Sequence, residues 1–129
     1  MRNLERHLVL ALSITALSAL PGCLAVAAAA AGAAGVAYVN GDLEGRLEAT
    51  PQEVVEASEG ALEEMDIKII SVAASGIDGK VVGRTALDKK IDITVKRDDD
   101  TGSTISIRVD TFGDEALSRQ IFEKTQARL

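Results

Sequence analysis

The sequence has little of the chemistry that most enzymes use. It has no tryptophan, one histidine and one cysteine, and both His7 and Cys23 lie near the N-terminus. From residue 24 onward, the absence of imidazole and thiol excludes a histidine general base, a cysteine nucleophile and a zinc site built on either ligand. A disulfide within one chain is also excluded. We expect a protein that is not an enzyme and that holds no metal or cofactor.

Aromatic residues are also scarce. Tyr38, Phe112 and Phe122 are the only three, so the core must consist mainly of isoleucine, valine, leucine and alanine. The folded part has about 90 residues, a size at which roughly two-thirds of the unfolded surface is buried. One small domain fits this length, with little room for a deep enzyme cleft.

Basic residues are in the minority. Residues 1–22 hold two of the 14 basic and one of the 20 acidic residues, so the remainder has 12 basic and 19 acidic residues and a net charge of −7. Nucleic-acid binding needs a basic surface, and we therefore expect no nucleic-acid partner. The same charge disfavours attraction of the domain to anionic lipid.

The longest apolar run lies at the N-terminus. Arg2 and Arg6 precede an apolar stretch at residues 8–20, which Pro21-Gly22 ends. A basic start and a short apolar run are typical of an export signal, whereas a membrane span needs about 20 apolar residues. We predict a signal peptide over residues 1–22.

The single cysteine follows directly. LPGC at residues 20–23 resembles the lipobox of bacterial lipoproteins, which implies that Cys23 carries a diacylglyceryl group and that the signal is cut before it. For a lipoprotein of this kind, the resemblance further implies that Leu24 in place of aspartate favours the outer membrane over the inner one, with the domain facing the periplasm. Three alternatives stay open: an inert apolar cysteine, cleavage after residue 27 to give a secreted protein, and an uncleaved anchor.

Residues 24–37 consist almost wholly of alanine, glycine and valine. We interpret residues 23–37 as the lipidated cysteine with a tether, and residues 38–129 as the domain. A segment inserted in the membrane beside the acyl chains is the alternative, because Ala28, Gly32 and Gly35 have the spacing that permits close helix contact.

Two helices are predicted from their starts. Thr50-Pro51-Gln52-Glu53 has a threonine cap, proline at the first position and glutamate three residues after the cap, and the helix should run to about Met65. Asp114 can cap a second helix from Glu115 to about Arg128. The inward stripe of the second helix is expected to contain Leu117, Ile121, Phe122 and Leu129.

Alternation of apolar and polar residues predicts the strands. The clearest are 91–95 and 105–109, and others are expected at 43–49, 67–73 and 80–86. Short connections favour antiparallel hairpins with one buried and one wet face. The fold class is therefore α+β, a two-layer sandwich with two helices on one face of a four- to five-stranded antiparallel sheet.

Two polar clusters invite a binding hypothesis. RDDDTGST at residues 97–104 lacks the glycine and glutamate positions of a calcium loop, and we interpret it as a hairpin turn. Arg84, Lys96 and Arg108 are expected on the wet face, where an arginine could hold a carboxylate or phosphate. Cross-strand ion pairs with Asp92 and Asp110 are the simpler interpretation. Arg108 is our candidate binding residue.

One stretch carries a family resemblance. Gly113 should allow a tight turn, Asp114 should cap the helix, and we expect Phe112 to fill the joint between the layers. Together with Tyr38, Gly41 and Leu43, the pattern IxIRVxxFGDE at residues 105–115 resembles an uncharacterised family of small bacterial lipoproteins, a domain of unknown function. Members of that family often have glycine where this chain has Asp66 and Asp110, two positions at which backbone freedom would help.

The function that we favour is that of a non-enzymatic envelope lipoprotein, held to the membrane by its lipid and acting as a binding or assembly module for an envelope protein. A small carrier or sensor of an apolar or anionic ligand is the alternative, and an enzyme built on carboxylates, lysines and hydroxyls comes third. A binding module should have an exposed apolar patch or edge strand, whereas a carrier should have an enclosed cavity.

Overall fold

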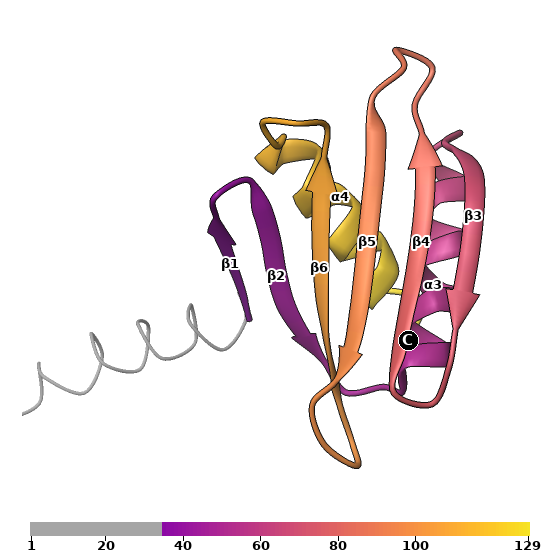
Figure 1. Ribbon diagram of the computed structural model, residues 1–129, viewed down its shortest axis with the longest axis vertical. Helices are drawn as coiled ribbons and strands as arrows, with labels where there is room; N and C mark the ends of the chain where they lie inside the picture. The colour runs from indigo at the N-terminus through magenta and orange to yellow at the C-terminus, as the bar shows by residue number, and fades with distance from the viewer. Residues whose placement is uncertain (1–34) are drawn as a thin grey trace, which may run out of the picture. The chain divides into compact units, whose positions relative to one another are not determined.

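A computed structural model describes residues 35–129 of the chain, and these residues form a sheet and two helices (Figure 1). The predicted signal peptide, Cys23 and most of the predicted tether lie outside the described residues. The elements in chain order are β1 (Val36–Val39), β2 (Asp42–Leu47), α3 (Pro51–Glu64), β3 (Lys68–Ala74), β4 (Asp78–Arg84), β5 (Lys90–Arg97), β6 (Ser103–Val109) and α4 (Glu115–Gln126).

The sheet is antiparallel throughout and has the strand order β1-β2-β6-β5-β4-β3. The α+β class with two helices is confirmed, but the sheet has six strands, so the predicted four to five was wrong. The additional strand, β1, begins at Val36, inside the segment assigned to the tether. Its four residues contain no charged side chain and continue an alanine-rich stretch, so the alternation that marks a strand is lost there.

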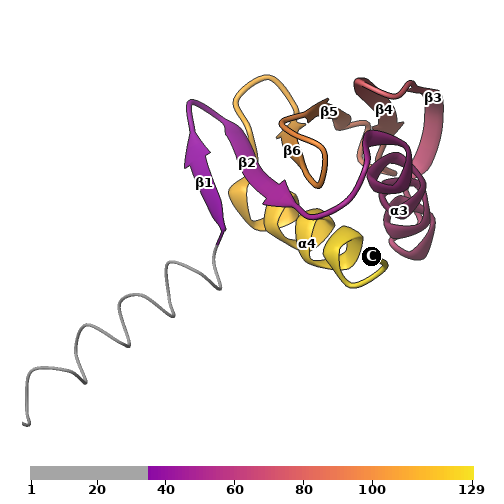
Figure 2. The ribbon, with the colours of Figure 1, turned by 90° about the horizontal axis from the view of Figure 1, so that it is seen from below.

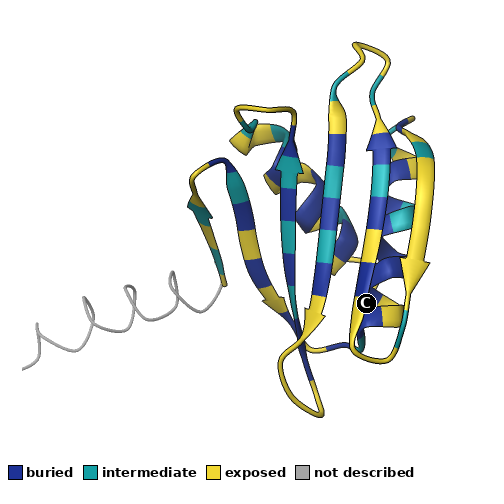
Figure 3. Cartoon of the chain, viewed as in Figure 1, coloured by how far each residue is buried: buried dark blue, intermediate teal, exposed yellow. Residues whose placement is uncertain are grey.

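Both helices lie on the same face of the sheet, which gives the two predicted layers (Figure 2). Alternate residues of the four central strands point toward the helices and are buried, as the banding in Figure 3 shows. The core between the layers consists of aliphatic side chains and one aromatic ring, that of Phe122. The other face of the sheet carries polar side chains and is open to solvent. We call it the open face.

The helix starts follow from the predicted caps. Thr50 Oγ1 accepts a hydrogen bond from the Glu53 backbone N–H at 3.3 Å, and the Glu53 carboxylate accepts one from the Thr50 N–H at 2.8 Å. This reciprocal capping box satisfies two backbone groups that the first turn would leave unpaired. Asp114 caps α4 by accepting a hydrogen bond from the Leu117 N–H at 3.0 Å.

Two predictions about apolar residues were wrong. Leu129 was expected on the inward stripe of the last helix, but α4 ends at Gln126 and Leu129 is half exposed. Phe112 was expected to fill the joint between the layers, but it lies in the turn between β6 and α4 and is almost fully exposed. In both cases the residue lies beyond a regular element, where helical or strand periodicity no longer fixes the direction of a side chain.

The two positions where related chains were expected to have glycine adopt the backbone angles that glycine favours. Asp66, just after α3, has φ 56°, and Asp110, just after β6, has φ 60°. Aspartate is one of the few residues that tolerate this region. Both aspartates therefore take a turn conformation without changing the course of the chain.

Candidate functional site

Arg108 lies on the open face, as its position in the alternating strand predicted. It is in β6, directly opposite Asp42 of β2 on one side and Asp92 of β5 on the other. Its guanidinium makes an ion pair with Asp42, with 2.9 Å between Nη1 and Oδ2. The ion pair with Asp42 replaces the predicted pairing of this face with Asp110, which lies in the turn beyond the strand.

The guanidinium also holds two turns. Nη1 donates a hydrogen bond to the Asn40 carbonyl at 3.3 Å, and Nη2 donates one to the Thr111 carbonyl at 3.2 Å. Asn40 belongs to the turn between β1 and β2, whereas Thr111 belongs to the turn between β6 and α4. Arg108 is half-buried between them and connects two segments that are far apart in the sequence. Because its donors are engaged by three protein oxygens, it is poorly placed to bind an external anion.

Two glycines let these turns approach each other. Gly41 and Gly113 have φ 91° and 82°, in the region that only glycine adopts easily. A Cβ atom at Gly113 would lie 2.6 Å from the Gly41 carbonyl oxygen and would overlap the Tyr38 hydroxyl. The motif residues Tyr38, Gly41, Arg108 and Gly113 therefore meet at one end of the sheet. Their common role is to fix the two turns, and the Phe112 side chain projects from the second of them.

The rest of the open face is a shallow polar hollow of about 410 Å³. Asp92 lies in it and pairs with Lys90 at 2.9 Å and, across the strands, with Lys80 at 3.1 Å. Its partners are therefore not the predicted Arg84, Lys96 or Arg108. Partial burial raises the pKa of Asp92, but the two lysines outweigh this effect and hold it below its usual value. Arg84 pairs instead with Asp88, at 3.0 Å. Lys96 remains on the rim of the hollow.

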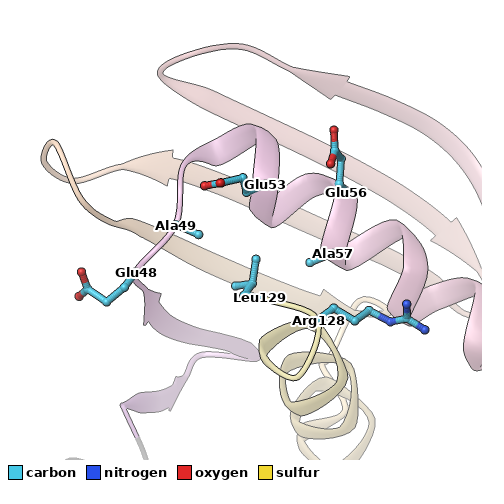
Figure 4. Close-up of a pocket in the computed structure, with 7 residues that line it drawn as sticks. All are labelled: Glu48, Ala49, Glu53, Glu56, Ala57, Arg128 and Leu129. Carbon is cyan, nitrogen blue, oxygen red and sulfur yellow. The ribbon is translucent and has the colours of Figure 1, made fainter.

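A second hollow, of about 360 Å³, lies between the start of α3 and the end of the chain (Figure 4). Glu48, Glu53 and Glu56 line it together with Arg128 and Leu129. Glu53 is used in the capping box, and Glu48 pairs with Arg46 at 2.9 Å. The acidic character of this hollow is thus partly explained by local structure.

The hairpin turn predicted at residues 97–104 is present between β5 and β6, and side-chain hydrogen bonds hold it. Asp99 Oδ1 accepts hydrogen bonds from the backbone N–H groups of Thr101 and Gly102, each at 2.9 Å. These bonds and the guanidinium of Arg46 lower the pKa of Asp99 to about 2. Within residues 35–129, no cluster of three or more potential metal ligands occurs in this turn or elsewhere.

The strand predicted at 67–73 is present as β3, but sequence reasoning did not find its position at the edge of the sheet. It forms one edge of the sheet, so its outer backbone groups have no neighbouring strand. Ile70 and Val72 are 53% and 42% exposed, and Lys68 is its only charged residue. The uncharged run from Ile69 to Ala74 is visible in the sequence, but periodicity does not tell which strand of a sheet lies at the edge.

The described part of the chain contains no helix that is both long and apolar enough to cross a membrane.

The family model described as a protein of unknown function (DUF3568) matches residues 6–128. A search of curated proteins finds no match to the chain.

Proposed function

The chain belongs to the DUF3568 family of proteins of unknown function, and we propose that it is a non-enzymatic lipoprotein of the bacterial envelope that binds an envelope protein. Its lipid is attached at Cys23, its domain faces the periplasm, and the outer membrane is the favoured location. The docking element is the free edge of β3.

The lipid anchor is supported by the sequence. The basic start, the apolar run and the LPGC tetrapeptide follow one another in the order that a lipoprotein signal has. The family match begins at residue 6 and so includes this segment as well as the domain. Replacement of Cys23 by serine should abolish labelling by a palmitate analogue and leave precursor of unchanged length. Labelling equal to that of the unaltered chain would contradict the anchor.

The exposed apolar edge of β3 is the observation that carries the docking role. Soluble proteins usually protect a sheet edge with charges, proline, a bulge or a covering segment. Here the edge has Lys68 at its start and a bulge between Ile69 and Ser71, whereas the half from Ser71 to Ala74 is regular and uncharged. An extended segment of a partner can add to such an edge, with backbone hydrogen bonds giving affinity and alternate side chains giving specificity.

A binding role also agrees with the chemistry of the domain. From residue 24 onward the chain has no histidine and no cysteine, and the charged side chains of the open face are mostly neutralised by one another. The alternative, a carrier of a small anionic ligand, is supported only by the polar hollow around Arg108, which is open to solvent and whose arginine is already engaged.

Site-specific photocrosslinking tests the docking element. A photoreactive residue in place of Ser71 or Ala73, introduced in the full chain in cells, should react with one extended segment of one envelope protein. The added charge of Val72→Lys should abolish both adducts, because a lysine there opposes strand addition. Gln120→Lys adds the same charge on the exposed side of α4 and should leave both adducts intact. Adducts that survive Val72→Lys would place the partner elsewhere.

A further inference from the structure

We propose that the domain also touches the lipid surface itself, through three exposed apolar side chains on neighbouring turns: Val39, Leu87 and Phe112, here called the apolar tip. The proposal rests on the lipid anchor of the proposed function but not on the β3 edge. It gives the domain a fixed orientation on the membrane, with the apolar tip toward the bilayer.

The three residues lie at the same end of the sheet (Figure 1). Val39 ends β1, Leu87 lies in the turn between β4 and β5, and Phe112 lies in the turn between β6 and α4. The antiparallel register places these three turns beyond the same row of paired residues, in which Asp42, Arg108 and Asp92 are neighbours. Val39 is 53% exposed, Leu87 83% and Phe112 91%. Three large apolar side chains are thus exposed to water at one end of the sheet.

The turns that carry the tip are held in place. Lys89 Nζ pairs with Asp114 Oδ2 at 3.3 Å, which connects the turn of Leu87 to that of Phe112. The Asp110 N–H also donates a hydrogen bond to the Lys90 carbonyl at 2.7 Å. Arg108 connects the turn of Phe112 to the end of β1. Side chains that project from fixed turns lose little conformational freedom when they bind.

Most charges around the tip are paired, whereas Asp110 is exposed and makes no ion pair within the described residues. Arg84 pairs with Asp88, Lys89 with Asp114, and Arg108 with Asp42. A domain with this arrangement is not drawn to anionic lipid by charge, which agrees with the acidic net charge of the chain. Contact with a bilayer is driven instead by the removal of apolar surface from water. A neutral lipid surface is therefore the partner that the tip fits.

The first strand of the domain leads to the tip. β1 begins at Val36 and ends at Val39, and three residues of strand span about 10 Å. The sequence has no charged side chain between Cys23 and Asp42. Residues 36–41 therefore bring no charged side chain to a bilayer.

A bilayer fits these residues better than a protein pocket does. The three side chains come from a strand end and two separate turns, and none of the hollows described above includes any of them. A protein partner would need a complementary cavity for each, whereas the interface of a bilayer accommodates separate apolar groups without matching their shape.

The lack of tryptophan makes a direct test possible. The full lipidated chain with Phe112→Trp is reconstituted in phosphatidylcholine vesicles whose acyl chains carry bromine, which quenches tryptophan fluorescence at short range. The matched control is Ile77→Trp, because Ile77 is also an exposed apolar residue in a turn but lies at the opposite end of the sheet, between β3 and β4. Flotation of the vesicles reports anchoring independently.

We expect the Phe112→Trp chain to emit at shorter wavelength than the Ile77→Trp chain and to lose most of its intensity to the brominated lipid, with no change on addition of salt. The fluorescence of the control chain should be unaffected by bromine. If chains that float with the vesicles show equal quenching of the two reporters, the lipid contact of the tip is overturned, but the lipid anchor is not. Failure to float would overturn both. Shielding of the reporter at position 112 from an aqueous quencher only after envelope proteins are added would show that the tip binds a protein, and would also overturn the proposal.

Discussion

The two phenylalanines of this chain have opposite surroundings, and the difference separates a structural residue from one available for contact. Phe122 of α4 is 5% exposed, and its ring lies against Gly45 of β2, where a Cβ atom would come within 2.6 Å of it. Phe112 is held outside the core by a turn that Arg108 and two glycines fix in place. The exposure of Phe112 is thus imposed by the fold, because the turn that carries it has a fixed conformation.

Alanine substitution should distinguish the two rings. Phe122→Ala leaves a cavity under the sheet and should lower the free energy of unfolding by about 3–5 kcal/mol. Phe112→Ala removes a side chain that contacts mainly water and should change the free energy by less than about 0.5 kcal/mol. Urea denaturation followed by circular dichroism measures both. A large loss for Phe112→Ala would mean that the ring is buried in solution.

Arg108 contributes more than an isolated surface ion pair would. Removal of an arginine from an exposed ion pair usually costs well under about 1 kcal/mol. In the structure Arg108 is half-buried and bonds to two backbone carbonyls as well as to Asp42. Arg108→Ala should therefore lower the free energy of unfolding by about 1–2 kcal/mol.

Arg119→Ala is the matched control, because Arg119 pairs with Glu115 one helical turn away and both are exposed. Its cost should stay below about 0.5 kcal/mol. Equal losses for the two arginine variants in urea denaturation would show that the contacts of Arg108 with the two turns contribute nothing to stability.

At the scale of elements, the sequence predicts regular structure well and the ends of elements poorly. The capping box at Thr50 and Glu53 and the alternation around Ile107 each depend on neighbours within four residues, so both could be recognised without the fold. The packing of β1 against β2, the exposure of Phe112 and the position of β3 at the edge depend on which strands are adjacent. The whole chain determines which strands are adjacent, and no local sequence pattern predicts it.

The same reasoning explains which features of the candidate site could be predicted from the sequence. Alternation placed Arg108 on the correct face, and glycine placed a turn at Gly113. That Arg108 holds the turn of Asn40, 68 residues earlier, follows from the pairing of β2 with β6. A strand pairing across an intervening helix and a hairpin meander is not visible in the spacing of residues.

The turn between β5 and β6 should make stability depend on acid. The pKa of the Asp99 carboxyl is about 2 in the folded domain, chiefly because the Thr101 N–H and hydroxyl and the Arg46 guanidinium bond to its charged form. The ordinary pKa of an aspartate is near ~4. A lowered folded pKa means that stabilisation is fully present above about pH 4 and is lost as the pH falls from about 4 to about 2.

Asp99→Asn should therefore be less stable than the unaltered domain at about pH 6, and the difference should shrink as the pH approaches about 2. Asp100→Asn is the control, because it removes the same charge from the same turn but none of the hydrogen bonds of Asp99. Urea denaturation across this pH range measures the difference, and carboxyl NMR measures the titration of Asp99 directly. A midpoint near the ordinary aspartate value would contradict the role of the network.

At the scale of the whole molecule, the described domain has a core of its own. Every residue of this hydrophobic core lies between Val36 and Phe122. The two helices are further joined at the surface, where Glu64 of α3 pairs with Lys124 at 2.6 Å and with Arg128 at 3.0 Å. These pairs lower the pKa of Glu64. We therefore expect that the domain can be separated from its predicted anchor without loss of its core.

The contribution of β1 decides where the domain begins. Residues 35–129 expressed alone should be soluble, with mixed helix and strand by circular dichroism and a single cooperative unfolding transition. Residues 41–129 lack β1, which leaves β2 at the edge and removes the partly buried side chains of Val36 and Tyr38 from the core. Partial burial of two such residues contributes about 2 kcal/mol, so the shorter chain should fold but unfold at a lower urea concentration. Identical midpoints would mean that β1 adds nothing to the domain, and an unfolded longer chain would contradict its independence from residues 1–34.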